Sequence, residues 1–253
     1  MNRSTTAAAV ESWISFRRPG PEARLRLFCF PYAGASALIF RAWPDGLPAD
    51  VEVCPVQLPG RGVRLMERPF AQLSPLVEAL AQALAPLLDK PFAFFGHSLG
   101  ALISFELARG FRRQYGVHPV RLFVSAGRAP HIPHRGPPIH TLAEKEFLAE
   151  LRRLNGTPSE LLDHEELMEI MLPLLRADFA LYENYVYSTE PPLNCPISAF
   201  GGIQDHRVNE SDLEAWRAQT TASFSLRMFP GDHFFLKQPL LLRVLSQELE
   251  QSR

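Results

Sequence analysis

Cysteine is scarce in this sequence, with three residues among 253. Cys29, Cys54 and Cys195 form no CxxC pair, and each lies in an apolar segment typical of a strand. An odd number of isolated cysteines in such segments argues against a disulfide framework and against a thiolate metal site. We therefore expect three reduced thiols in the protein core and a cytoplasmic location.

Long apolar runs and an excess of charge of one sign are also missing. The longest uncharged stretch, residues 27–40, contains proline and glycine and is shorter than the ~20 residues that a membrane-spanning helix needs. The N-terminal residues have no signal-peptide core, and 26 basic residues are balanced by 27 acidic ones. We accordingly expect a soluble protein that binds neither membranes nor nucleic acid.

Motifs for nucleotides and metal ions are absent too. The sequence has no GxxxxGK motif and no GxGxxG motif after an expected strand, so nothing supports a nucleotide cofactor. His131 and His134 could be taken for metal ligands, but no third ligand follows at a suitable spacing. We expect neither a cofactor nor a metal ion.

Six strand-like apolar segments alternate with segments of helical periodicity. Strands separated by helices of this length indicate an α/β protein with a mostly parallel, doubly wound sheet. A chain of this length can form such a sheet as one domain, which we expect over residues 1–253. The expected strands are 24–30, 51–57, 92–95, 120–125, 196–201 and 224–229, with a weak edge strand at 13–16, and the expected helices are 72–88, 99–113, 211–219 and 240–250.

The alternation stops between the strands at 120–125 and 196–201. A proline-rich turn there leads into helical segments that we expect at 141–154, 159–171 and 174–187. Thr141 and Glu144 have the spacing of a capping box at the start of the first helix. A helical insertion between two strands of one sheet predicts a lid over about residues 130–190.

The segment Gly96-His97-Ser98-Leu99-Gly100 stands between an apolar strand and an amphipathic helix. GxSxG in this context is typical of a nucleophile elbow, a sharp turn that presents the serine above the sheet edge. The two glycines allow the strand and the helix to approach closely, and the helix N-terminus favours negative charge. We predict Ser98 as a nucleophile; the alternative is a glycine-rich turn with a capping serine.

A nucleophilic serine needs a histidine base, which follows it late in the chain in this kind of sheet. His233 lies between the last strand and the last helix, where its imidazole can reach the sheet edge. We predict His233 as the base, and we expect His97, inside the elbow, to point away from the serine.

The base in turn needs an orienting carboxylate. The loop after strand 120–125 contains none, whereas Asp205 follows strand 196–201 at a glycine turn. Asp205 is therefore the predicted acid. Asp232 is adjacent to His233, and its side chain cannot readily reach the imidazole of its neighbour.

Two backbone amides are expected to form an oxyanion hole. One belongs to Leu99, which follows the nucleophile, and the other to the loop after the first sheet strand. Pro31 and Gly34 indicate a tight turn in that loop. We prefer the Tyr32 amide, with Ala33 as the alternative.

Arginines cluster in two places: Arg61, Arg64 and Arg68, and Arg109, Arg112 and Arg113. We interpret both clusters as exposed residues that interact favourably with helix dipoles. The alternative is that they bind an acidic partner protein.

Taken together, several segments resemble the type II thioesterases that accompany modular polyketide and nonribosomal peptide synthases. The resemblance implies an α/β-hydrolase fold with a helical lid and hydrolysis of acyl groups from the phosphopantetheine arm of acyl or peptidyl carrier proteins. It carries over Ser98, Asp205 and His233 as the catalytic triad and the Tyr32 and Leu99 amides as oxyanion donors, and we expect a monomer. The matching segments are FCFPYAGASA (28–37), QLPGRGVR (57–64), FFGHSLGALISFELAR (94–109), LLRADFALYENY (174–185), GGIQDHRV (201–208) and FPGDHFFL (229–236).

Other functions remain open at this point. The same fold could carry a medium-chain fatty acyl-carrier thioesterase, or a general esterase, lipase or peptidase. A non-catalytic protein that binds carrier domains through its lid is a further alternative.

Overall fold

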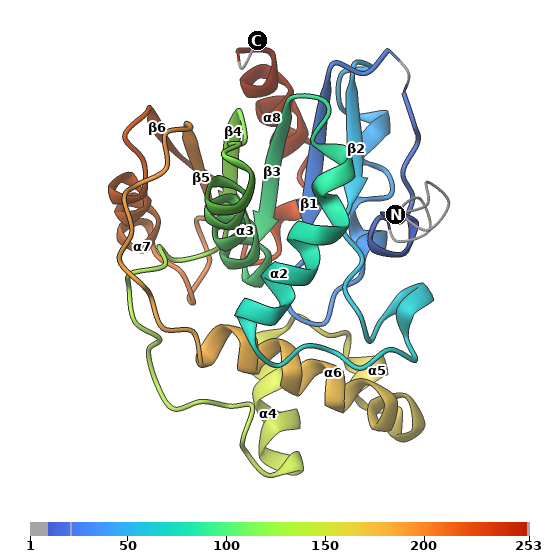
Figure 1. The fold of residues 1–253 in the computed structure, drawn as a ribbon. Helices are drawn as coiled ribbons and strands as arrows, with labels where there is room; N and C mark the ends of the chain where they lie inside the picture. Colours follow the sequence, from blue (N-terminus) through green and yellow to red (C-terminus); the bar gives the residue numbers. More distant parts are fainter. Residues whose placement is uncertain (1–9, 21, 252–253) are drawn as a thin grey trace.

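A six-stranded sheet lies at the centre of the computed structural model, which describes residues 10–20 and 22–251 (Figure 1). The strand order is β2-β1-β3-β4-β5-β6, and every neighbouring pair is parallel. Parallel sheets are covered on both faces, which explains why most of these strands are almost wholly apolar. The strands are β1 (Leu25–Phe30), β2 (Val51–Pro55), β3 (Phe92–His97), β4 (Arg121–Ser125), β5 (Ile197–Gly202) and β6 (Phe224–Phe229).

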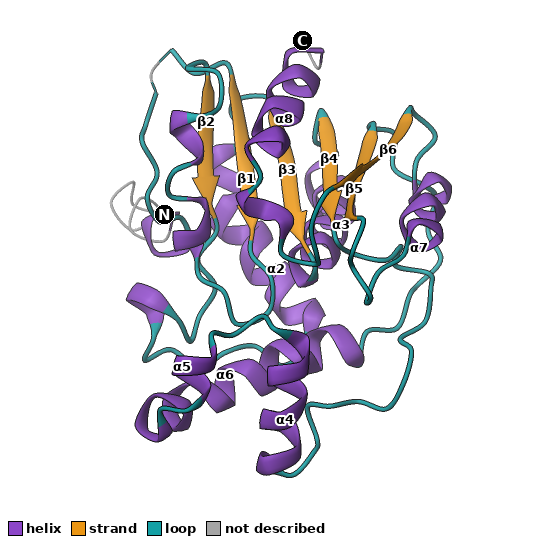
Figure 2. Cartoon of the chain, turned by 180° about the vertical axis from the view of Figure 1, so that it is seen from behind, coloured by secondary structure: helices purple, strands orange, loops and turns teal. Residues whose placement is uncertain are grey.

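Helices cover the two faces of this sheet (Figures 1 and 2). The apolar cluster on one face includes side chains of α2 (Leu73–Leu84), α3 (Leu99–Tyr115) and α7 (Glu210–Glu214). The cluster on the other face includes side chains of α8 (Pro239–Gln251) and of the short 3-10 helices η1 (Ala37–Phe40) and η2 (Trp43–Asp45). The remaining 3-10 helices are η3 (Gly62–Arg64), η4 (Ala85–Leu87), η5 (Ala215–Gln219) and η6 (Phe235–Lys237). No helix within the described ranges is long and apolar enough to cross a membrane.

Three helices occupy the expected insertion between β4 and β5. They are α4 (Glu144–Leu154), α5 (Ser159–Leu162) and α6 (Glu165–Glu183), and Figure 1 shows them beyond the carboxyl ends of the strands. They have an apolar cluster of their own, which includes Phe147 and Met168. The six strands and the place of the insertion agree with the sequence prediction.

The boundaries of the inserted helices differ from the prediction. We expected a break at Pro173, but α6 continues through it. Proline removes one backbone donor from the helix. Pro173 is exposed, so water can bind the carbonyl that loses its partner. The predicted capping box at Thr141 is also wrong, because α4 begins at Glu144 and the Thr141 hydroxyl donates to the Pro138 carbonyl.

The weak edge strand expected at residues 13–16 is wrong as well. Residues 10–13 form a helical turn, and only Ile14 makes an antiparallel bridge, with Val56. Trp13 and Ile14 are buried in the apolar cluster beneath α2 and α3. Their apolar character therefore reflects burial rather than sheet formation.

Candidate active site

The backbone at Ser98 makes the sharp turn expected of a nucleophile elbow. Its φ of 54° and ψ of −113° lie outside the regions that non-glycine residues favour. A side chain at Gly96 would collide with the backbone at Gly100, and one at Gly100 with the backbone of Phe30. Both glycines are therefore needed for β1, β3 and α3 to meet, and their close approach holds the strained turn in place.

The Ser98 hydroxyl contacts an imidazole that is itself held by a carboxylate. Ser98 Oγ lies 3.0 Å from His233 Nε2, and His233 Nδ1 lies 2.7 Å from Asp205 Oδ2. The other Asp205 oxygen accepts hydrogen bonds from the backbone amides of Arg207 and Val208. The structure thus brings together, from the ends of β3, β5 and β6, the three residues that the sequence singled out.

Burial and charge favour the protonation states that a base and its orienting acid need. Burial lowers the pKa of His233, and the positive charge of Arg207 lowers it further, although the hydrogen bond with Asp205 acts in the opposite direction. For Asp205, burial acts to raise the pKa, but the bonds from His233 and from the two amides outweigh it and the pKa is lowered. At neutral pH the imidazole is therefore uncharged and the carboxylate ionised.

The other candidate side chains take separate positions. His97 points away from Ser98 and bonds to Ser125 and to the His233 backbone. Asp232 accepts a hydrogen bond from the Phe234 amide and makes no hydrogen bond with the imidazole of His233.

The two histidines considered as metal ligands have different partners. His131 Nδ1 accepts a hydrogen bond from the Gln219 amide group, and His134 Nδ1 accepts one from Arg128.

The loop after β1 passes close to Ser98. A hydrogen bond from the Ala35 amide to the Tyr32 carbonyl closes its tight turn, and Gly34 in the turn has a φ of 81°. Within the described residues, the backbone amides of Tyr32, Ala33 and Leu99 donate to no other group. Each of these three N–H groups therefore lacks a competing acceptor in the described part of the chain, as an oxyanion donor must.

Ser98 contributes to the walls of two recesses. The small recess, of about 30 Å³, is bounded by Tyr32, Ala33, His233 and Phe234 and by residues of α4 and α6. The large recess, of about 430 Å³, runs along residues 128–134 and 182–187. The large recess has room for an acyl group bound to Ser98, whereas the small one has room for only about two water-sized groups.

Of the side chains that line the small recess, the sequence singled out Phe179 among the large apolar residues of the insertion but not the others. Leu151 and Leu154 from α4, Leu175 from α6 and Arg207 from the loop after β5 line it, together with Phe179. The large apolar residues of the insertion that the sequence offers as possible lining of an acyl tunnel are Phe147, Leu148, Leu161, Leu167, Met168, Phe179 and Tyr182. Tyr182 lines the large recess. Phe147 and Met168 are instead buried among the inserted helices, and Leu167 is exposed. Helical periodicity reveals an apolar face but not which of its residues meet a neighbour and which meet a cavity.

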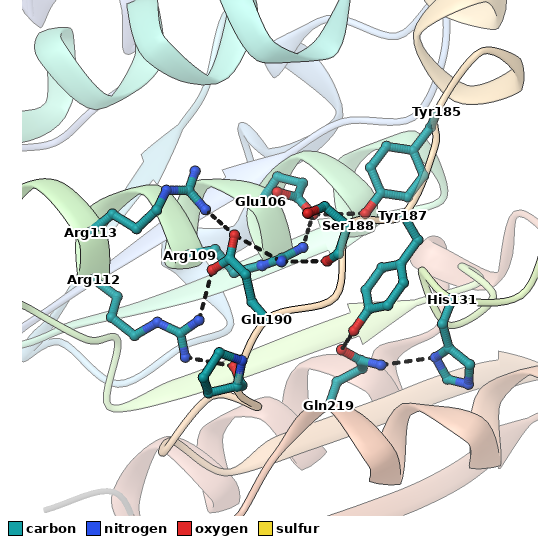
Figure 3. A network of polar contacts seen from close by, with 11 residues as sticks. Glu106, Arg109, Arg112, Arg113, His131, Tyr185, Tyr187, Ser188, Glu190 and Gln219 are labelled. Carbon is teal, nitrogen blue, oxygen red and sulfur yellow. Dashed lines mark hydrogen bonds and ion pairs between the residues drawn. The ribbon is translucent and has the colours of Figure 1, made fainter.

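A polar network braces the chain between α6 and β5, next to the large recess (Figure 3). The Arg109 guanidinium donates to Glu106 and to the Ser188 carbonyl and pairs with Glu190 at 2.8 Å. The Tyr185 hydroxyl donates to the same Glu106 carboxylate at 2.7 Å. The interpretation of Arg109 as part of a solvated face is therefore wrong, because its side chain is buried against carboxylates of this chain.

Arg112 and Arg113 join the network at Glu190, which accepts from both guanidinium groups (Figure 3). In the other arginine cluster, Arg61 and Arg64 are also buried, contrary to the prediction. Arg68 is the one member of that cluster that is exposed, as expected.

Comparison with known proteins identifies the family of this fold. Residues 25–249 match the thioesterase domain family. A curated relative from Brevibacillus parabrevis, LgrE, is 48% identical over 97% of this chain and 95% of its own length. That protein is named linear gramicidin dehydrogenase, but the glycine-rich motif after β3 in this chain is GxSxG, a motif of hydrolases.

Solved structures of thioesterases are also similar to this one. The type II thioesterase BorB from the borrelidin biosynthetic cluster superimposes with a TM-score of 0.85, at 36% identity over 94% of this chain and 98% of its own. The type II thioesterase YbtT from the yersiniabactin NRPS/PKS pathway has a TM-score of 0.80, at 30% identity over 95% and 96%. With a family match over most of the chain and a parallel sheet that carries a nucleophile elbow, this protein belongs to the thioesterase family of the α/β-hydrolase fold and is a thioester hydrolase.

Proposed function

We propose that this thioesterase hydrolyses acyl groups from the phosphopantetheine arm of acyl or peptidyl carrier proteins, and so edits or releases chains in polyketide or nonribosomal peptide biosynthesis. The observation that carries the proposal is the hydrogen-bonded series Asp205–His233–Ser98 at the junction of two recesses. The names of the similar type II thioesterases, from borrelidin and yersiniabactin biosynthesis, support the choice of pathway class.

In the proposed reaction, Ser98 Oγ attacks the thioester carbonyl carbon while His233 Nε2 takes the hydroxyl proton. Asp205 accepts a hydrogen bond from Nδ1 and keeps the imidazole in the tautomer that can act as a base. The Leu99 amide and the Tyr32 amide, or Ala33 as the alternative, donate to the oxyanion. Each such donor contributes about 3–4 kcal/mol at the tetrahedral stage.

The tetrahedral intermediate then expels the pantetheine thiol, which takes its proton from His233, and leaves an acyl ester on Ser98. A water molecule, deprotonated by His233, attacks this ester and releases the acid. These steps need no cofactor beyond the arm of the carrier protein. Three buried free thiols support the proposed cytoplasmic location, and we propose that the chain acts as a monomer.

The test compares the wild-type protein with Ser98→Ala on a carrier protein that bears a short acyl group. The wild-type protein should release the acid, and the variant should retain the melting temperature but less than a few per cent of the turnover. A fluorophosphonate probe should label the wild-type protein and not the variant. Turnover by Ser98→Ala above that level would rule out Ser98 as the nucleophile.

The alternative functions predict other outcomes of this experiment. A strong preference for oxygen esters over thioesters would indicate an esterase or lipase. A preference for medium-chain acyl carriers would indicate a thioesterase of fatty acid synthesis. If the wild-type protein is neither labelled by the probe nor active, the remaining alternative is a non-catalytic protein that binds carrier domains.

A further inference from the structure

Arg61 and Asp178 form a buried ion pair between two motifs to which the proposed mechanism assigns no role. Arg61 lies in the segment QLPGRGVR, and Asp178 lies on α6 in LLRADFALYENY. Two parallel hydrogen bonds of 2.6 and 2.7 Å join the guanidinium to the carboxylate, and both side chains are almost fully buried. The two parallel hydrogen bonds of such a pair fix the relative orientation of the guanidinium and the carboxylate. A third segment that bonds to both groups is therefore held in a defined position.

The third element in contact with this pair is the loop that carries the proposed oxyanion donor. The Gly34 amide donates to Asp178 Oδ2 at 2.7 Å, and Arg61 donates to the Ala35 carbonyl at 3.2 Å. A side chain at Gly34 would collide with Leu175, so α6 lies directly against the turn. The backbone on the C-terminal side of Tyr32 and Ala33 is thus held by one carboxylate and one guanidinium.

The same part of α6 also forms a wall of the small recess. Leu175 and Phe179, which flank Asp178 on the helix, line it together with Tyr32, Ala33 and Ser98. A shift of α6 therefore moves the recess and the turn together. Because Asp178 holds the Gly34 amide, the position of α6 is transmitted to the turn that carries the proposed oxyanion donor.

We propose that Arg61 and Asp178 are positioning residues that hold the oxyanion loop in its productive geometry and couple it to the inserted helix α6. The inference rests on the proposed function, since it assumes an oxyanion at Ser98. It holds for either candidate donor, because Tyr32 and Ala33 both belong to the turn that contains Gly34. A displacement of about 1 Å in such a site costs on the order of 100-fold in rate.

The test uses Asp178→Asn, which keeps the shape and one acceptor but loses the charge and one of the two bonds from Arg61. Arg61→Lys is the second variant, since lysine keeps the charge but lacks the planar fork. We expect kcat to fall about 10-fold to 100-fold on both a small activated ester and an acyl carrier, with KM little changed. The affinity for a short-chain trifluoromethyl ketone, whose adduct with Ser98 presents an oxyanion, should fall by a similar factor.

Glu52→Gln is the matched control. Glu52 is a buried carboxylate that pairs with Arg26 and Arg17, and it lies at the amino end of the sheet, away from the site. Its replacement should lower the melting temperature as Asp178→Asn does, while kcat and ketone affinity stay at the wild-type values.

Two results would overturn the inference. One is a wild-type kcat in Asp178→Asn and Arg61→Lys together with a lowered melting temperature, which would make the pair purely structural. The other is an equal loss of kcat in Glu52→Gln, which would make the effect one of general stability. If Asp178→Asn does not fold, Arg61→Lys decides the question by the same measurements. Neither result would contradict the proposed function, because that function is tested separately by Ser98→Ala.

Discussion

His97 donates a hydrogen bond from Nε2 to the backbone carbonyl oxygen of His233, at 2.9 Å. Because a carbonyl only accepts, Nε2 must carry the proton, and Nδ1 accepts from the Ser125 hydroxyl, also at 2.9 Å. Burial, and then repulsion from His233, hold the pKa of His97 well below its usual value, so the ring stays neutral. The residue before the nucleophile thus fixes the backbone that carries the base.

Replacing His97 with phenylalanine tests this link. Phenylalanine keeps a ring of similar size, but the buried His233 carbonyl loses its donor. We expect the stability to fall by about 1–3 kcal/mol. Turnover should fall about tenfold with little change in KM, because the imidazole of His233 is less well placed. Urea unfolding and steady-state kinetics measure the two effects.

Ser125→Ala is the control for this variant, since it removes the outer partner of His97 and keeps the bond to His233. It should retain most of the turnover. Wild-type turnover in His97→Phe would show that the His233 backbone needs no such support.

The two aspartates near His233 should differ strongly in their effects. Asp205→Asn removes the carboxylate that sets the tautomer of His233, and we expect kcat to fall by about 10³–10⁴-fold. Asp232→Asn changes the acceptor of the Phe234 amide and removes the weakest of the charges that act on the pKa of His233, so it should cost a few-fold at most. Hydrolysis of an acyl carrier by both variants measures the contrast, and a reversed order would make Asp232 the acid.

The pH dependence of kcat/KM should report the lowered pKa of His233. The base must be neutral, so activity is lost as pH falls through this pKa. Because burial lowers it from the usual 6.5, the midpoint of the acid limb should lie below pH 6.5. A midpoint above 6.5 would contradict the predicted environment of the imidazole.

Arg207 provides a second test of the same pKa. Its positive charge helps to lower the pKa of His233, so Arg207→Gln should move the acid limb to higher pH. Arg217→Gln, which removes an exposed arginine paired with Glu214, should leave the profile unchanged. Equal profiles for the wild-type protein and Arg207→Gln would show that the charge of Arg207 does not contribute to the lowered pKa of His233.

The inserted helices should influence which acyl groups are accepted. Leu154 lies at the end of α4 and lines the small recess beside Ser98. Leu154→Ala should move the preference towards longer or bulkier acyl groups, and Leu154→Phe towards shorter ones, because the recess grows or shrinks. Relative rates across a series of acyl carriers measure the shift.

The rate on a small activated ester should change little in both Leu154 variants, in contrast to the loss expected for Asp178→Asn. Leu167→Ala, on the exposed side of α6, is the control for the surface of the insertion. An unchanged acyl preference in both Leu154 variants would mean that α4 does not influence which acyl groups are accepted.

The sequence alone was sufficient to predict the sheet, the site of the insertion and the meeting of Ser98, Asp205 and His233. These features follow from short-range signals: apolar strands, helical periodicity, two glycines around a serine, and loops at the carboxyl ends of parallel strands. The six strands lie where these signals indicate. The three side chains meet because parallel strands bring their carboxyl ends to one edge of the sheet.

Only the tertiary structure determined which groups the arginines contact and which residues of the inserted helices line the recess. Arg61 meets Asp178 across 117 positions of sequence, and Arg109 reaches Ser188 across 79. In the sequence a buried arginine looks the same as a solvated one, because its environment depends on which distant carboxylate the fold brings near. For the same reason, periodicity revealed the apolar face of the lid, whereas packing decided that Phe147 fills its core and Leu154 lines the recess.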